Sequence, residues 1–135
     1  LDNESVRKGA QIFESIACAK CHVPSMTTGI TTISAISNQK IFAYTDMLLH
    51  DMGDDLADNR PDFLANGNEW KTRPLWGIGL TEVVNGHTDF LHDGRAKNIT
   101  EAILWHGGEA LASKNKFKAL STTEREALLL FINSL

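Results

Sequence analysis

The chain has 135 residues, of which 42% are hydrophobic and 22% charged, the balance of an ordinary globular protein. Thirteen basic and seventeen acidic residues give a formal net charge of −4, which argues against nucleic-acid binding. No apolar run reaches the ~20 residues that a membrane-spanning helix needs. We therefore expect one domain over residues 1–135, without a membrane span, an internal repeat or a linker.

The first predicted element is a helix over residues 3–20. Apolar or small residues recur there at helical spacing, at Val6, Gly9, Phe13 and Ile16. A glycine weakens a helix but allows a second helix to approach closely. Pro24 is predicted to end this helix, because proline removes a backbone donor and clashes with the preceding turn.

At the end of this helix stands Cys18-Ala19-Lys20-Cys21-His22, the attachment signature of a c-type haem. On a helical face, both cysteines can bond the haem vinyl groups while His22 reaches the iron as proximal ligand. A zinc site would need a further pair of ligands, and the chain has only two cysteines. A thioredoxin-like site would need a βαβ pattern around the cysteines, and the sequence shows none. The Pro24 carbonyl is the predicted acceptor for the second ring nitrogen of His22.

One covalently bound haem c also has consequences for location. Such haems are attached outside the bacterial cytoplasm, so we expect a periplasmic or otherwise exported protein. The chain opens on Leu1 without an export signal, as a mature chain or a fragment of a longer protein would.

The middle of the chain carries weaker signals. Residues 25–39 are predicted to form a loop with room for one short strand, and residues 41–50 are helical or extended. An acidic stretch follows around Gly53, formed by Asp51, Asp54, Asp55, Asp58 and Asp62. It is either a solvated loop or a calcium site, although its spacing does not match an EF-hand.

Turn and cap signals organise the second half. Asn66-Gly67 predicts a turn, and Asn85-Gly86 predicts a hairpin. Asn98 caps a helix that Gly107-Gly108 closes. A capping box at residues 121–124 opens the last helix, whose apolar stripe is Leu128, Phe131, Ile132 and Leu135. A pair of terminal helices that cross at a glycine resembles the cytochrome c core, so the predicted fold is mainly α with short β pieces.

The ligand on the other side of the iron decides between an electron carrier and an open site. The candidates are Met26, Met47, Met52, His50, His87, His92 and His106. His106 ends an apolar helical face and is favoured, although a histidine in a last turn also interacts well with the helix dipole without any metal. Met52 is the alternative thioether ligand, although most methionines simply pack in a core.

Four segments, residues 44–53, 69–79, 90–96 and 101–110, resemble signatures of the bacterial di-haem thiol-oxidoreductase-like family. This family belongs to the superfamily of bacterial cytochrome c peroxidases and MauG. The resemblance implies two cytochrome c-like domains with one haem each, of which this chain is similar to the C-terminal one. In the peroxidases a methionine ligand lies fourteen positions after the histidine of a His-Asp-Gly motif, and MauG has a tyrosine there. The same count from His92 reaches His106.

The remaining candidates would surround the haem. Arg73 and Arg95 are expected to pair with its propionates, or else to be ordinary surface charges. The pocket wall is expected from the tryptophans, Trp70, Trp76 and Trp105. His92, from the His-Asp-Gly motif, joins the cofactor-binding set. Lysines 114, 116 and 118 could dock an acidic redox partner or form a solvated face.

Three functions follow from these residues. The first is one-electron transfer to a redox partner protein or a second haem domain, with His22 and His106 on the iron. The second is a share in a di-haem peroxidase or oxidase, whose second haem domain this chain lacks and for which Glu109 and His92 are the acid–base candidates. The third is a sensor that binds a gas at a labile sixth position. We assign no catalytic residue to the chain by itself.

Overall fold

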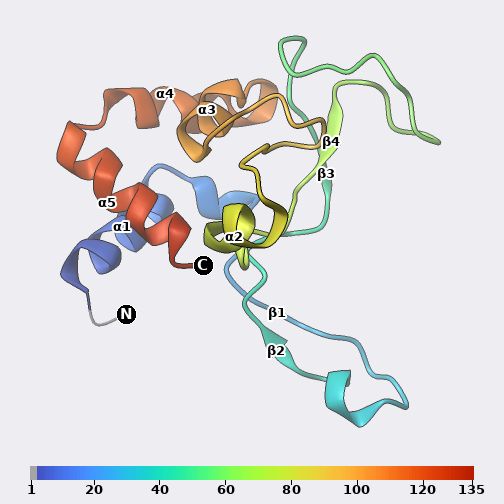
Figure 1. Cartoon of the computed structure of the whole chain (residues 1–135). Coiled ribbons are helices and arrows are strands. Elements are labelled where there is room, and N and C mark those ends of the chain that lie inside the picture. The colour runs from blue at the N-terminus through green and yellow to red at the C-terminus, as the bar shows by residue number, and fades with distance from the viewer. Residues whose placement is uncertain (1–2) are drawn as a thin grey trace.

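A computed structural model describes residues 3–135 (Figure 1). Its α-helices in that range are α1 (Glu4–Ser15), α2 (Thr81–Asn85), α3 (Ile99–Trp105), α4 (Leu111–Ala119) and α5 (Thr122–Asn133). The strands pair antiparallel as β1 (Met26–Thr27) with β2 (Lys40–Ile41), and β3 (Leu49–Asp51) with β4 (Glu69–Lys71). The predicted class, mainly α with short β pieces, is confirmed. No helix in this range is long and apolar enough to cross a membrane.

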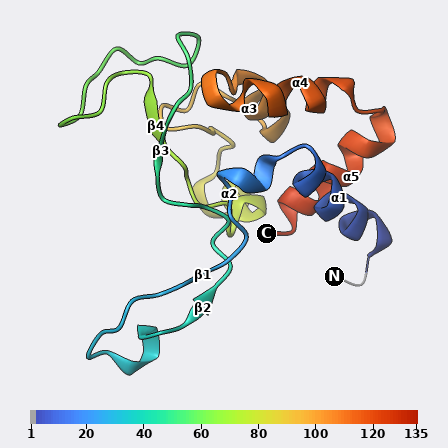
Figure 2. The ribbon, with the colours of Figure 1, turned by 180° about the vertical axis from the view of Figure 1, so that it is seen from behind.

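The main core lies between α1 and α5, which cross at Gly9 (Figures 1 and 2). A Cβ atom on Gly9 would lie 2.0 Å from the Ala127 carbonyl oxygen and 2.6 Å from the Phe131 Cβ. Only glycine therefore permits this approach, as predicted. The core members are Val6, Ile12, Phe13, Ile16, Phe117, Ala127, Leu128, Phe131 and Ile132. Burial of each large apolar side chain stabilises the fold by about 1.5–3 kcal/mol.

The predicted helix starts are confirmed by their caps. The Ser121 hydroxyl accepts a hydrogen bond from the Glu124 amide, and the Glu124 carboxylate accepts one from the Ser121 amide, which completes the capping box. The Asn98 side chain accepts from the Glu101 amide at 2.8 Å and so begins α3. Ile99 and Ile103 of α3 pack against the main core, so its apolar face is turned inward as expected.

The first helix ends earlier than predicted. It stops at Ser15, because Ala17 adopts the left-handed conformation with φ of 72°. A short 3-10 helix, η1 (Cys18–Lys20), follows and carries the Cys-x-x-Cys-His motif. The predicted helix to residue 20 and its termination by Pro24 are therefore wrong, because the backbone reverses hand before the motif begins.

A second correction concerns Asn85-Gly86. These residues do not turn a hairpin; they end α2, where Gly86 has φ of 74° and caps the helix. At Asn66-Gly67 the predicted turn is confirmed, since the Glu69 amide donates to the Asn66 carbonyl at 3.2 Å. Residues 41–50 are not helical: Ile41 ends β2, Leu49 begins β3, and residues 42–48 between them are irregular, with positive φ at Tyr44 and Met47.

Two segments project from the helical core (Figures 1 and 2). One is the arm of β1, the 3-10 helix η2 (Ser34–Ile36) and β2, and the other is the loop between β3 and β4. The segments that frame the candidate site lie nearer the core: η1, the stretch before β3, and the end of α3.

Candidate haem site

Two imidazole rings lie close together beside the main core. The ring centroids of His22 and His106 are 6.4 Å apart, with 47° between the ring planes. His22 follows η1, and His106 ends α3, so the two come from opposite ends of the chain. The Phe13 ring lies 6.4 Å from the His22 ring and links the pair to the α1–α5 core.

Each of these rings has one nitrogen committed to a backbone carbonyl. Nδ1 of His22 donates to the Tyr44 carbonyl at 3.1 Å, and Nδ1 of His106 donates to the Ala102 carbonyl at 2.7 Å. A carbonyl oxygen can only accept, so both Nδ1 atoms carry the proton. Both Nε2 atoms are then left with a free lone pair, which is the form of histidine that binds a metal.

Tyr44, not Pro24, supplies the acceptor for His22. The predicted Pro24 acceptor is wrong because the chain returns beside the haem motif: Thr45 donates its amide to the Val23 carbonyl at 3.0 Å. Tyr44 itself has φ of 53°, which turns its carbonyl toward the His22 ring. Pro24 lies next to this contact, partly buried.

Burial keeps both histidines neutral. Desolvation and, after it, the nearby His106 lower the pKa of His22 to about 4. Desolvation likewise lowers the pKa of His106. At neutral pH both rings therefore keep their Nε2 lone pairs.

The two thiols are not activated for redox chemistry of their own. They are free, and burial raises the pKa of the Cys18 thiol to about 11. Burial, and then Asp46 and Glu109, also raise the pKa of Cys21. A reactive thiol needs a lowered pKa. These cysteines therefore fit an anchoring role better than thiol–disulfide exchange.

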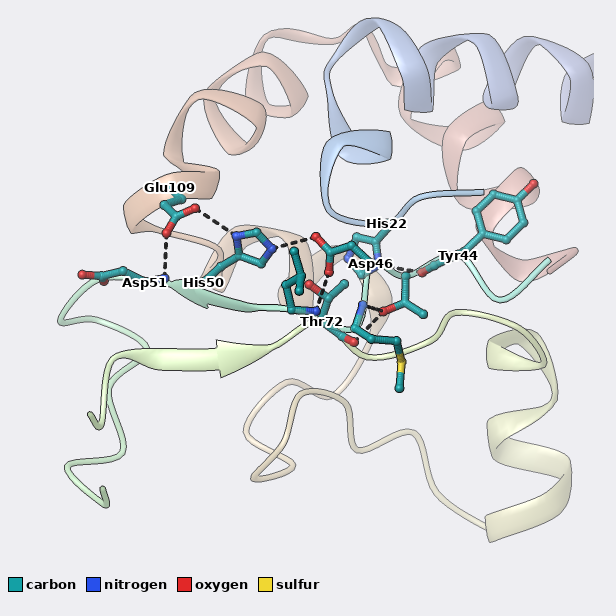
Figure 3. A network of polar contacts seen from close by, with 10 residues as sticks. His22, Tyr44, Asp46, His50, Asp51, Thr72 and Glu109 are labelled. Carbon is teal, nitrogen blue, oxygen red and sulfur yellow. Dashed lines mark hydrogen bonds and ion pairs between the residues drawn. The ribbon is translucent and has the colours of Figure 1, made fainter. Parts of the chain in front are cut away.

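A network of polar side chains lies beside His22 (Figure 3). The His50 ring bonds Asp46 through Nε2 at 2.8 Å and Glu109 through Nδ1 at 2.9 Å. The second oxygen of Glu109 accepts the Asp51 amide at 3.0 Å. Sequence reasoning missed this network, because Glu109 lies 59 residues from His50.

Two adjacent glycines bring Glu109 to His50. Glu109 belongs to the 3-10 helix η4 (Gly108–Ala110), which packs against β3. A Cβ atom on Gly108 would lie 2.2 Å from the Asp51 carbonyl oxygen, and one on Gly107 would lie 2.6 Å from that of Met52. The Gly107-Gly108 pair thus closes α3, as predicted, and also lets η4 meet the end of β3.

A family model described as "Di-haem oxidoreductase, putative peroxidase" matches residues 1–135. The chain belongs to this di-haem oxidoreductase family. No curated protein matches it, and no solved structure does. The family implies that haem is bound, which confirms the resemblance drawn from the sequence.

The residues of this chain fit a c-type haem. At about 2.0–2.1 Å from metal to nitrogen, two imidazoles on opposite sides of one metal hold their ring centroids roughly 6 Å apart. The observed 6.4 Å is close to this span, and both Nε2 lone pairs are free. Cys18 and Cys21, the two thiols of the attachment signature, stand directly before His22.

Met52 and His92, two other residues considered as partners of the haem, lie at a second hydrophobic cluster. Met52 is buried with Leu56 and Trp70, and Leu91 and Trp105 pack against them. The His92 Nε2 bonds the Lys71 carbonyl at 2.7 Å, and its ring meets the Trp70 ring edge-on at 4.9 Å. The imidazole ring beside that of His22 belongs to His106 and not to His92.

The two predicted propionate partners differ in their surroundings. Arg95 donates to the Asp93 carboxylate at 2.7 Å and to the Asp55 carbonyl at 3.0 Å. Its guanidinium also lies 5.6 Å from the Trp70 ring centroid and 5.2 Å from that of Trp105. Arg95 thus has a carboxylate already. Arg73 is exposed, and no bond to it is recorded within residues 3–135.

The tryptophans and the acidic stretch are also placed. Trp70 is buried and Trp105 partly buried in the second cluster, whereas Trp76 is 54% exposed. Two aspartates of the acidic stretch bond their own loop: Asp51 accepts the Gly53 amide, and Asp58 accepts the Arg60 amide. In the described part of the chain they form no cluster that could hold calcium.

Proposed function

We propose that this chain is the electron-transfer module of a di-haem oxidoreductase, with one covalent haem c in a cytochrome c-like fold. Cys18 and Cys21 would hold it by thioether bonds, and His22 and His106 would ligate the iron. The single observation that carries the proposal is the pair of neighbouring imidazoles, with ring centroids 6.4 Å apart and Nε2 free on both rings.

The protein residues then set the conditions for electron transfer. A bound haem supplies a one-electron couple. The carbonyls of Tyr44 and Ala102 hold both rings, so these two side chains would keep their orientation on gain or loss of an electron. As ligands, the two neutral rings would leave no room for water on the iron.

The partner in this proposal is a second haem. The family is di-haem, whereas the 135 residues contain one attachment motif and no further cysteine. We propose that the second haem belongs to another domain or protein and carries out any peroxide chemistry, because His22 and His106 would leave this iron without an open position. The same proposal includes a location outside the cytoplasm, because c-type haem is attached there in bacteria.

Carbon monoxide binding by the reduced protein tests the axial pair. We expect wild type to bind it slowly or not at all, and His106→Ala to bind it promptly, because the sixth position is opened. His87→Ala is the matched control: His87 is 54% exposed on the loop after α2, and this variant should behave like wild type.

Two results would contradict the proposal. Prompt binding by wild type would indicate a labile sixth position and favour the sensor. An unchanged response in His106→Ala, with haem content and helical circular dichroism retained, would remove His106 from the iron.

A further inference from the structure

The Asp46–His50–Glu109 network is not needed to hold a haem, yet it lies against the attachment site. The Cys21 sulfur, an Asp46 carboxylate oxygen and a His50 nitrogen all lie within 4.8 Å of one another. A charge on His50 is therefore close to the point where the haem would be anchored (Figure 3).

The hydrogen bonds of His50 depend on whether its ring is charged. Each of its two ring nitrogens faces a carboxylate oxygen, at 2.8 Å for Asp46 and 2.9 Å for Glu109. A neutral imidazole has one N–H and can serve only one of these acceptors. Both bonds are made only by the protonated ring, so gain or loss of one proton makes or breaks a bond in this network.

The network also runs from the interior to solvent. The Asp46 side chain is 12% exposed, that of His50 16%, and that of Glu109 56%. The buried end is held firmly, because Asp46 also accepts the Leu48 amide at 2.9 Å. The open end at Glu109 gives His50 access to protons from water.

Three other charged residues lie near His50 on the paired strands β3 and β4. Asp51 neighbours His50 on β3, and Glu69 and Lys71 flank its cross-strand partner Trp70 on β4. None of the three bonds the His50 ring among the recorded contacts. The hydrogen bond to Glu109, against the opposing effect of burial, and then the bond to Asp46 raise the pKa of His50.

We propose that Asp46, His50 and Glu109 form a proton-binding site that takes up one proton from solvent when the haem is reduced. The inference rests on the proposed function. One electron from an external one-electron donor lowers the positive charge at the iron, and one proton from water restores it nearby. The N–H bond that forms is at Nδ1 of His50, toward Glu109, while Nε2 keeps its proton toward Asp46.

The test is a redox titration of the haem-loaded protein from about pH 5 to about pH 10, with a window set by the ordinary histidine pKa near ~6.5. We expect the wild-type potential to be level at the acid end and to fall as pH rises above that value. Each tenfold difference in proton affinity between the two oxidation states corresponds to about 59 mV.

The diagnostic variant is His50→Gln, which keeps a hydrogen-bonding side chain but cannot carry the proton. Its potential should match wild type at the alkaline end, where His50 is neutral, and lie below it at the acid end. His87→Gln is the matched control, because His87 is exposed beside only one carboxylate, Asp89 at 3.7 Å. It should keep the wild-type slope.

Several outcomes would overturn the inference. One is a His50→Gln potential with the wild-type slope, and another is a constant offset at every pH, which would indicate a structural role. A second measurement, dye-monitored proton uptake on dithionite reduction in weak buffer, must give less uptake in His50→Gln than in wild type. If His50→Gln fails to fold, Glu109→Gln should move the fall in potential to lower pH, and an unmoved fall excludes the site.

The titration separates this inference from the proposed function. A one-electron curve that ignores His50 keeps the electron carrier and removes the proton site. A protein without haem absorbance removes both.

Discussion

His50 is bonded on both sides, so its state of protonation affects stability as well as potential. Because its folded-state pKa is raised, the folded protein holds the His50 proton more tightly than the unfolded chain does. The resulting stabilisation is fully present below the unfolded-state value near ~6.5 and is lost as pH rises through the folded-state value.

Replacement of His50 by glutamine should therefore cost more stability in acid than in base. We expect the free energy of unfolding to fall by about 1 kcal/mol near pH 6, a modest value because Glu109 is largely exposed to screening solvent. Above the folded-state pKa the difference should shrink. Urea unfolding at several pH values measures this. A loss that grows toward alkaline pH would contradict the assigned bonds.

At the residue scale, local sequence signals were enough to make His106 a candidate. It ends a helical face whose residues, Ile99 and Ile103, pack against the main core. The Tyr44 carbonyl could not be found, since its contact with His22 depends on a positive φ and on the path of a chain segment 22 residues away.

At the scale of elements, the α1–α5 crossing decides how close the two helices can come. In an isolated helix, replacement of glycine by alanine is stabilising by roughly 0.5–1 kcal/mol. At Gly9 the added carbon would meet the Ala127 carbonyl oxygen at 2.0 Å. Tertiary packing therefore predicts that alanine at position 9 lowers stability, whereas helix propensity alone predicts that it raises stability.

Gly9→Ala should destabilise the protein by about 1–3 kcal/mol, since the helices must separate to admit the methyl group. Gly29→Ala is the matched control, because nothing lies within 4 Å of a Cβ atom there. It should change stability by less than about 0.5 kcal/mol. Thermal unfolding of both variants measures the difference. Equal effects would show that the close approach at Gly9 is unimportant.

Caps explain which elements could be predicted. The starts of α3 and α5 follow from side chains three residues apart, Asn98 with Glu101 and Ser121 with Glu124, and such local bonds are visible in sequence. The end of α1 could not be predicted in this way, because alanine has no preference for the left-handed conformation that Ala17 adopts. Asn85-Gly86 suits a hairpin and a helix end equally well, and the structure uses the second.

At the scale of the whole molecule, the site is assembled from three distant stretches: residues 18–22, 44–50 and 106–109. The α1–α5 core holds the first, the β3–β4 pair holds the second, and α3 with η4 delivers the third. The mainly α class was predictable because α1, α3 and α5 have side-chain N-caps and apolar residues at helical spacing. The polar network was not, because it joins loops whose approach depends on Gly107 and Gly108.

The central claim is that His22 and His106 hold one iron between them. Low-temperature electron paramagnetic resonance of the ferric, haem-loaded chain tests it most directly. We expect a low-spin signal as the dominant species, because two imidazoles would ligate the iron. A dominant high-spin signal, which a haem with an open or water-filled sixth position gives, would contradict it.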